Sequence, residues 1–266
     1  MPLQRANEVE LYYELRGDGP PLLLMMGASG YGGVLGRFAE LLADEFTVVT
    51  YDRRGNGRSP KPAGWTATSP EEQADDAAAL LAGLDLAPAA IFGTSSAGIF
   101  ALAALMGHPE SVRGAVLHEP ALFALFDDPN SVRKSLSQLV REGMEAGGPA
   151  RAFERFLRFG AGDANWERLE PGVQRAMLAS ADTYFGVESG AFDSYLPDEE
   201  TLASISRPIK LLVSEHSHAF FAEAAARLAE RLGVEAARTP GTHFPYLDHP
   251  HELAQTVRPF LRRVSR

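Results

Sequence analysis

Short apolar runs alternate with amphipathic stretches over most of the chain. The runs are largely continuous, which is typical of strands that are buried on both faces of a parallel sheet. They lie at residues 22–26, 46–51, 89–92, 114–118 and 209–213. Apolar positions recur with helical spacing at residues 38–43, 69–84, 97–106, 220–232 and 250–264. This alternation predicts a parallel sheet with helices on both faces.

The amino-terminal part of the chain predicts a strand pair. Residues 9–15 are rich in strand-forming side chains, and a turn follows at Gly17–Pro20. We expect this first strand to pair with the apolar run at residues 22–26.

The alternation stops between residues 120 and 207. The segment predicts several helices, with breaks at residues 147–149, 160 and 171–172. It is rich in aromatic side chains, namely Phe123, Phe126, Phe153, Phe156, Phe159, Trp166, Tyr184, Phe185 and Phe192. We therefore predict a core domain formed by residues 1–119 and 208–266, and a helical cap, or lid, formed by residues 120–207.

A serine lies at the predicted junction between a buried strand and a helix. In Gly93-Thr94-Ser95-Ser96-Ala97-Gly98, small residues stand two positions before and two positions after Ser95. A sharp strand-to-helix turn needs small residues there, and it lifts the central hydroxyl above the edge of the sheet. The pattern predicts Ser95 as a nucleophile. Ser96 is an alternative, but it lacks the symmetric small neighbours.

A serine nucleophile needs a base. His243 lies in the glycine-containing segment 240–245, from which a loop before the last helix can hold an imidazole over the serine. We predict His243 as that base. Two His-x-His pairs, at residues 216/218 and 249/251, could ligate a metal. No carboxylate spacing supports such a site, so we predict neither a metal nor a cofactor.

Composition and charge restrict the partners of the protein. The 25 Lys and Arg residues are outnumbered by 35 Asp and Glu residues, which gives a formal net charge of −10. Such a surface repels phosphate backbones and anionic lipids, so we expect no nucleic-acid or membrane partner.

The absence of Cys excludes disulfides and Cys nucleophiles. Because the first eight residues lack an apolar signal core and no stretch is long enough to span a bilayer, we expect a cytoplasmic enzyme.

Four segments together resemble the α/β-hydrolase superfamily over nearly the full chain. They are Met26-Gly27-Ala28, Tyr51-Asp52-Arg53-Arg54-Gly55-Asn56-Gly57-Arg58-Ser59, the Ser95 turn, and His243-Phe244-Pro245. The resemblance implies an α/β fold with a mostly parallel, eight-stranded sheet, flanking helices and an inserted helical cap. Within the superfamily the chain resembles most the fungal zearalenone-type lactone hydrolases. These share a Ser-Ser turn, a His-Glu pair after the following strand, and a Pro-Gly-x-His-Phe-Pro-Tyr segment near the end.

The catalytic acid is where the chain departs from many relatives. Many carry an Asp in the loop after the last apolar run, about where this chain has Ser217. Because the carboxyl ends of parallel strands lie along one edge of a sheet, Glu119 is expected beside Ser95, and the resemblance to the lactonases implies the same position for the acid. Glu215 is the alternative acid, since it lies in the customary loop. If Glu119 instead forms an ion pair with a nearby Arg such as Arg113, its role would be structural and not catalytic.

The resemblance implies acyl transfer, with the backbone N–H groups of Ala28 and Ser96 as the oxyanion hole. Met26 replaces the His of many relatives without removing a backbone donor. A Ser at the turn, where dehalogenases and epoxide hydrolases have Asp, favours cleavage of an ester or lactone through an acyl-enzyme. The aromatic side chains of the predicted cap indicate that the substrate is bulky and apolar. The alternatives are thioester hydrolysis, cleavage of C–C bonds beside ketones, cofactor-free perhydrolase or haloperoxidase activity, and a binding protein with little turnover. The sequence leaves open whether the chain forms a homodimer.

Overall fold

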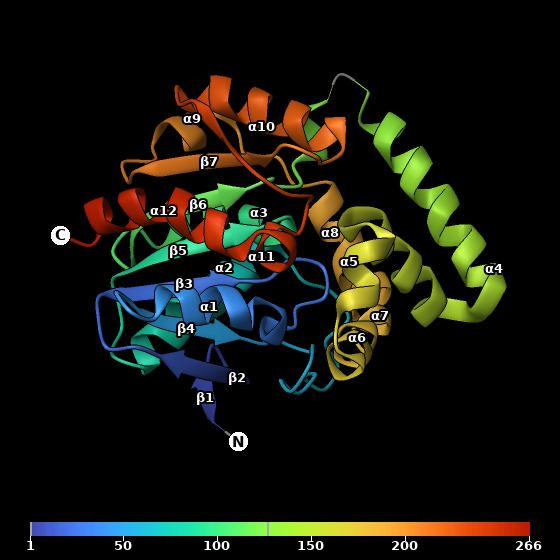
Figure 1. The fold of residues 1–266 in the computed structure, drawn as a ribbon, viewed down its shortest axis with the longest axis horizontal. Helices are drawn as coiled ribbons and strands as arrows, with labels where there is room; N and C mark the ends of the chain where they lie inside the picture. Colours follow the sequence, from blue (N-terminus) through green and yellow to red (C-terminus); the bar gives the residue numbers. More distant parts are fainter. Residues whose placement is uncertain (1, 127) are drawn as a thin grey trace.

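The computed structural model describes residues 2–126 and 128–266 (Figure 1). Met1 of the predicted core and Asp127 of the predicted cap lie outside the described residues. Within them an eight-stranded sheet has the order β1-β2-β4-β3-β5-β6-β7-β8. Its strands are β1 Leu3–Ala6, β2 Val9–Arg16, β3 Pro21–Met25, β4 Thr47–Tyr51, β5 Ala89–Thr94, β6 Val112–His118, β7 Ile209–Ser214 and β8 Ala236–Thr239. All neighbouring pairs from β4 to β8 are parallel, so the predicted α/β-hydrolase sheet is confirmed.

One predicted strand pairing is wrong, because β2 does not pair with β3. Instead β2 is antiparallel to β1 on one side and to β4 on the other, with Tyr13 opposite Tyr51. β3 lies between β4 and β5. Since its side chains are mostly buried, β3 fits the middle of the sheet, whereas β2 is buried at Val9, Leu11 and Tyr12 but partly or fully exposed from Tyr13 to Arg16, and so fits a place near the edge. The apolar pattern does not predict β1 and β8, which are short edge strands with exposed residues.

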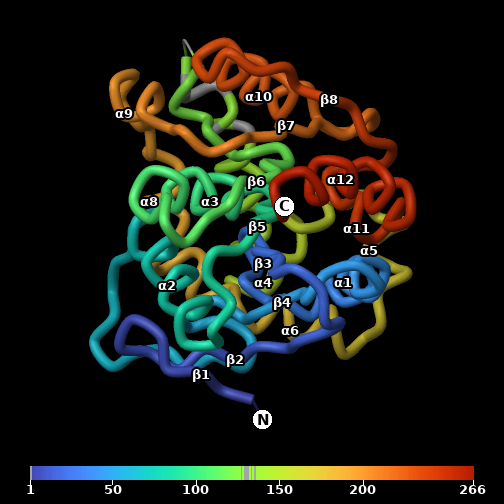
Figure 2. The backbone as a smooth tube through the Cα atoms, turned by 90° about the vertical axis from the view of Figure 1, so that its left-hand side faces the viewer, coloured from blue at the N-terminus to red at the C-terminus, as the bar shows by residue number. Residues whose placement is uncertain are grey.

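Helices cover both faces of the sheet because successive side chains of a strand point to opposite faces. Leu22 and Leu24 of β3 belong to the same core cluster as apolar residues of α1, α11 and α12, whereas Leu23 and Met25 belong to the cluster that contains apolar residues of α2, α3 and α10. Figure 2 shows α1 and α12 on one side of the sheet and α2 and α3 on the other. The flanking helices are η1 Gly32–Leu35, α1 Gly36–Leu42, α2 Pro70–Gly83, α3 Ser96–Gly107, α10 Ala219–Leu232, α11 Pro245–Asp248 and α12 Pro250–Val264.

The segment between β6 and β7, here called the helical insertion, begins at Pro120 and ends at Arg207. Its helices are η2 Phe123–Leu125, α4 Pro129–Ala161, α5 Asp163–Arg168, α6 Pro171–Leu178, α7 Ala181–Thr183, η3 Tyr184–Glu188, α8 Ser189–Asp193 and α9 Glu199–Ala203. α4 is interrupted at Gly148, where φ is +75°. In Figure 1, α4 to α8 lie together beside one end of the sheet, and α9 lies near α10. The division into a core domain and a cap domain stays a prediction.

The carboxyl ends of β5, β6 and β7 lie side by side, because these three strands are neighbours and parallel. β5 leads into Ser95, β6 leads into Glu119, and β7 leads into the loop that contains Glu215. The fold therefore brings the predicted nucleophile and both candidate acids to one edge of the sheet.

Candidate active site

Ser95 lies in the turn between β5 and α3 and has an unusual backbone conformation. Its φ is +58° and its ψ is −127°, a region that non-glycine residues seldom adopt. Close packing makes the turn possible, since a Cβ at Gly93 would lie 2.3 Å from the carbonyl oxygen of Ala97. The N–H of Ser95 donates to the carbonyl of His118 at 3.0 Å, which ties the turn to β6. The small residues around Ser95 are thus a steric requirement of the turn.

Glu119 follows β6 and is fully buried, with 0% of its surface exposed. Its Oε1 accepts a hydrogen bond from the Ser214 N–H at 2.8 Å, and its Oε2 accepts one from the Ser217 hydroxyl at 2.8 Å. Oε2 is also hydrogen-bonded to Nδ1 of His243. Burial acts to raise the pKa of Glu119, but the imidazoles of His118 and His243 and the N–H of Ser214 outweigh burial and hold the pKa below its usual value. The group is therefore a carboxylate near neutral pH.

His243 lies in the loop between β8 and α11, and only 4% of its surface is exposed. The ring of Phe221 stacks on its imidazole, with 3.8 Å between the ring centroids and 9° between the planes. A Cβ at Gly160 would lie 3.3 Å from Cδ2 of His243, so the helical insertion also packs closely against the imidazole. Together with the bond to Glu119, these contacts fix the orientation of the ring and leave Nε2 for another partner.

Ser95 and His243 line the same cavity, but among the described residues no hydrogen bond joins the Ser95 hydroxyl to the imidazole. Catalytic hydrogen bonds are often long in the substrate-free state and tighten when substrate binds. The structure thus joins Glu119 to His243 directly, and it joins Ser95 to them through the shared cavity.

The cavity has a volume of about 360 Å³ and is mostly apolar. The helical insertion contributes much of its wall, including Phe123, Leu136, Val140, Phe156, Leu157, Phe159, Tyr184, Phe185 and Phe192. Phe220, Phe221 and Phe244 of the core complete the aromatic lining. The hydroxyl of Ser96 is buried at the cavity without a hydrogen-bond partner among the described residues. A ligand in this cavity would meet aromatic rings on most sides and a few polar groups beside Ser95.

Both predicted oxyanion donors, Ala28 and Ser96, line the cavity. The loop after β3 passes very close to the nucleophile turn, because a Cβ at Gly27 would lie 2.8 Å from the Thr94 carbonyl oxygen and 3.0 Å from Cβ of Ser95. The loop that carries Ala28 therefore lies against the turn that carries Ser95 and Ser96.

The alternative roles for the carboxylates have different surroundings. Glu215 is exposed, and its N–H donates to the carbonyl of Thr239. Arg113 donates to the carbonyl of Pro88 at 3.0 Å, not to Glu119. Of the two candidate acids, Glu119 is therefore the one in contact with His243.

His118, the first residue of the His-Glu pair, supports the site through contacts that the sequence pattern does not indicate. It is fully buried, and its ring nitrogens are hydrogen-bonded to the hydroxyls of Thr94 at 2.9 Å and Ser214 at 3.0 Å. Burial lowers the pKa of His118 to about 4, so its imidazole is neutral near neutral pH. Its position directly before Glu119 was the available signal, but the partners come from two other strands.

Two broader features bear on the site. The described part of the chain contains no group of three or more His, Cys, Asp or Glu side chains arranged to hold a metal ion. Neither of the two His-x-His pairs therefore belongs to such a group. Among the described helices, none combines the length and apolar character that crossing a membrane requires.

Known proteins resemble this chain along its whole length. Among curated proteins, the hydrolase YraK of Bacillus subtilis (strain 168) is 29% identical over 261 residues, which cover 96% of this chain and 94% of the relative. The zearalenone hydrolase of Bionectria ochroleuca is 26% identical over 268 residues, covering 96% of this chain and 95% of the relative. Among solved structures, a thermophilic esterase from Thermogutta terrifontis matches with a TM-score of 0.80 at 23% identity, covering 100% of this chain and 99% of the esterase.

The family assignment rests on a match to most of the chain. The model of the alpha/beta hydrolase family matches residues 13–256. The relative from Bionectria ochroleuca also confirms the resemblance to zearalenone-type lactone hydrolases. The chain is therefore a hydrolase of the alpha/beta hydrolase family.

Proposed function

We propose that the protein hydrolyses a carboxylic ester or a lactone through an acyl-enzyme formed on Ser95. The observation that carries this proposal is the hydrogen bond between Nδ1 of His243 and the buried carboxylate of Glu119, on an imidazole that shares a cavity with Ser95. In this arrangement the carboxylate selects the tautomer whose Nε2 accepts a proton, and it stabilises the imidazolium that forms.

In the proposed reaction, Nε2 of His243 takes the hydroxyl proton of Ser95 as Oγ attacks the carbonyl carbon. The resulting oxyanion accepts hydrogen bonds from the backbone N–H groups of Ala28 and Ser96. The tetrahedral intermediate then expels an alkoxide, which receives the proton from His243, and an acyl ester of Ser95 remains. His243 then takes a proton from water as the water attacks the acyl carbon, and it returns that proton to Oγ of Ser95 as the bond to the acyl group breaks and the acid leaves. With a lactone, the expelled alkoxide stays attached to the acyl group, so the product is one hydroxy acid.

The cavity supports a bulky, apolar substrate. Its wall consists mainly of aromatic and aliphatic side chains, and the helical insertion supplies many of them. We infer that residues 120–207 act as a cap over the core formed by residues 1–119 and 208–266. The likeness to a zearalenone hydrolase supports a lactone as one substrate class.

Labelling with a fluorophosphonate tests the nucleophile. We expect wild-type protein and Ser96→Ala to be labelled, and Ser95→Ala to remain unlabelled. The two variants remove the same hydroxyl group from adjacent residues, so each controls for the other. Persistent labelling of Ser95→Ala would exclude Ser95 as the nucleophile.

Turnover of a p-nitrophenyl ester tests the acyl-enzyme. We expect a burst of p-nitrophenol close to the enzyme concentration, followed by a slower steady state. Wild-type protein that is neither labelled nor active on any ester would support a binding protein instead. A panel of macrolactones, small lactones, aryl esters and thioesters then identifies the substrate class, and added hydrogen peroxide tests for perhydrolase activity.

A further inference from the structure

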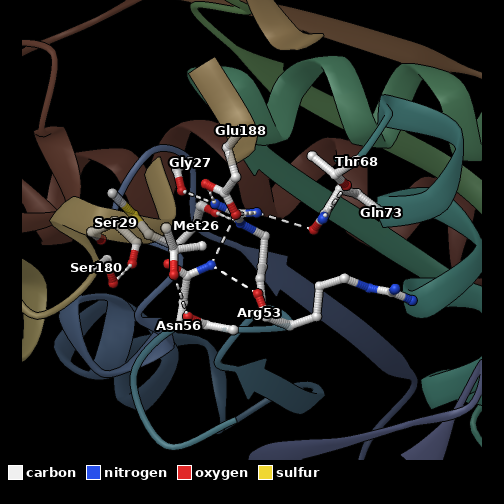
Figure 3. Close-up of polar contacts among 12 residues, drawn as sticks. Met26, Gly27, Ser29, Arg53, Asn56, Thr68, Gln73, Ser180 and Glu188 are labelled. Carbon is white, nitrogen blue, oxygen red and sulfur yellow. Dashed lines mark hydrogen bonds and ion pairs between the residues drawn. The ribbon is translucent and has the colours of Figure 1, made fainter. Parts of the chain in front are cut away.

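Arg53 lies directly beneath the loop that carries the proposed oxyanion donor. It is fully buried, and all five of its N–H groups are used. Nε donates to the carbonyl of Met26 at 3.0 Å, and Nη2 donates to the carbonyl of Gly27 at 3.0 Å. The remaining donors contact Gln73 Oε1 at 3.0 Å and the two carboxylate oxygens of Glu188 at 2.7 and 2.9 Å. Figure 3 shows the guanidinium between these acceptors.

Glu188 belongs to the helical insertion, and its side chain is also fully buried. Its Oε1 accepts a further hydrogen bond from Asn56 Nδ2 at 2.9 Å. A second contact from the insertion reaches the same loop, since the hydroxyl of Ser180 donates to the carbonyl of Ser29 at 2.5 Å (Figure 3). The loop after β3 is thus held directly by Arg53 of the core and by Ser180 of the insertion, and Glu188 of the insertion holds Arg53.

The bond to Gly27 has a specific consequence for the site. The carbonyl of Gly27 and the N–H of Ala28 belong to one planar peptide group, in which the two bonds point in opposite directions. Fixing the carbonyl on Arg53 therefore fixes the direction of the Ala28 N–H. A cationic donor on the carbonyl also polarises the amide, which strengthens the N–H as a donor on the other side.

We propose that Arg53 and Glu188 are a positioning pair, which aims the Ala28 N–H at the oxyanion and makes its aim depend on the seating of the helical insertion. The inference rests on the proposed acyl-transfer function. Neither side chain lines the cavity, so both act through the Gly27–Ala28 peptide and not on the substrate. The stability of the fold does not by itself explain why an ion pair is present at this position, because buried ion pairs are often no more stabilising than apolar side chains of similar volume.

The neighbouring pair of Arg54 and Asp76 provides a matched control. Both side chains are buried, and Asp76 accepts two hydrogen bonds from the guanidinium. Asp76 also accepts from Asn7, and Arg54 also contacts Glu72. Since no hydrogen bond in the described residues connects this pair to the loop after β3, Asp76→Asn removes a buried carboxylate charge without disturbing the oxyanion donor.

The experiment compares Glu188→Gln with Asp76→Asn, using a p-nitrophenyl ester and a trifluoromethyl ketone that forms a tetrahedral adduct. We expect Glu188→Gln to lower kcat about 10- to 100-fold with little change in KM, because a misaimed donor loses part of the roughly 10²–10³ that a full oxyanion donor contributes. Binding of the ketone should weaken by a similar factor. Asp76→Asn should lower Tm to a comparable degree and keep kcat within about twofold of the wild type.

Glu188→Asp keeps the charge but shortens the reach, so it should show the same selective loss of kcat if Glu188→Gln fails to fold. Wild-type kcat in either folded variant, or equal loss of kcat in Asp76→Asn, would overturn the proposal. Unfolding of both Glu188 variants while Asp76→Asn folds would assign the pair a purely structural role. Fluorophosphonate labelling of Ser95 in the wild type separates these results from a failure of the proposed function itself.

Discussion

At the scale of single residues, Glu119 is held by hydrogen bonds from two parts of the chain, the end of β7 with the loop after it and the loop that carries His243. Its two oxygens accept hydrogen bonds from Ser214 and Ser217, and the remaining contact goes to His243. Ser217 lies about where many relatives carry the acid, so the loop after β7 contributes a donor here in place of the carboxylate. In the proposed mechanism these contacts would keep the carboxylate of Glu119 oriented toward His243.

Replacing the carboxylate tests its role. We expect Glu119→Gln to lower kcat by about 10³- to 10⁴-fold, because an amide in this place favours the wrong tautomer of the imidazole. Glu215→Gln makes the same chemical change at an exposed position of the next loop and should leave kcat nearly unchanged. Steady-state hydrolysis of a p-nitrophenyl ester measures both. The opposite ranking would move the acid to Glu215.

His118 makes stability depend on pH. Its pKa falls from 6.5 in the unfolded chain to about 4 in the folded protein because of burial. Between these values the unfolded state binds a proton that the folded state does not, so stability decreases as the pH falls. The pKa of Glu119 is also lowered in the folded protein. Its contribution to the stability of the fold is lost only at more acidic pH, as the pH falls through that lowered pKa.

The variant His118→Gln keeps polar contacts but does not titrate. From about pH 7 to about pH 5, the wild type should lose roughly 2 kcal/mol more unfolding free energy than the variant, because each pKa unit corresponds to about 1.4 kcal/mol. Urea unfolding at the two pH values measures the difference. Parallel losses in the two proteins would show that His118 does not titrate in this range.

At the scale of elements, the site depends on the close approach of two loops, the one after β3 and the one after β5. Gly27 is the point of contact, since a Cβ there would meet the backbone of Thr94 at 2.8 Å. A larger side chain at Gly27 would push the two loops apart and so separate the proposed oxyanion donors from Ser95.

Gly27→Ala is expected to lower kcat by about 10²-fold while the protein remains folded, because a misplacement of about 1 Å is enough for such a loss. Gly36→Ala is the matched control, since Gly36 begins α1 in a helical conformation and has nothing within 4 Å of an added Cβ. The control should retain kcat and gain up to about 1 kcal/mol in stability. Circular dichroism and ester turnover test both variants, and unchanged kcat in Gly27→Ala would contradict the role of this contact.

The elements themselves differ in how well the sequence predicts them. β3 and β5 are apolar throughout and bounded by turn residues, and α2 begins with a serine N-cap followed by Pro70, so local pattern is sufficient. The partner of β2 is not predictable in the same way, because strand pairing depends on competition among all strands. β1 and β8 lack an apolar run, since each lies at an edge of the sheet.

The residues of the candidate site also differ in how well the sequence predicts them. Ser95, Glu119 and His243 each have a local signal in a turn, a strand end or a loop motif. Arg53 and Glu188 are 135 positions apart, and only the packed insertion brings them together. A glutamate within a helical, aromatic segment gives no indication that it is buried, so its partner is visible only in three dimensions.

At the scale of the whole molecule, the cavity forms where the helical insertion meets the carboxyl ends of the strands. Phe156 and Phe185 come from the insertion, whereas Ser95 and His243 come from the core. The proposed catalytic groups and the aromatic wall that we propose selects the substrate are therefore carried by different parts of the fold.

Shortening a side chain of the cavity wall should change the selectivity between substrates more than the rate of the chemical step. We expect Phe185→Ala to raise kcat/KM for bulky aryl esters relative to small ones by about 10-fold, since filling or emptying an apolar pocket changes discrimination by 10- to 200-fold. Leu196→Ala removes an exposed apolar side chain outside this cavity and should leave the ratio unchanged. Competition between a p-nitrophenyl acetate and a longer ester measures the ratio, and equal ratios in both variants would argue against a substrate-selecting wall.

Ser95 and Glu119 both have positive φ, +58° and +44°, at the ends of adjacent strands. Such conformations cost non-glycine residues about 1–3 kcal/mol each, and the surrounding packing must offset that cost. Replacing Ser95 with glycine would relieve that backbone cost and, in the proposed mechanism, abolish turnover, so selection for heat tolerance alone would favour sturdier but inert proteins. Any screen for industrial robustness in this scaffold has to score product formation in every round.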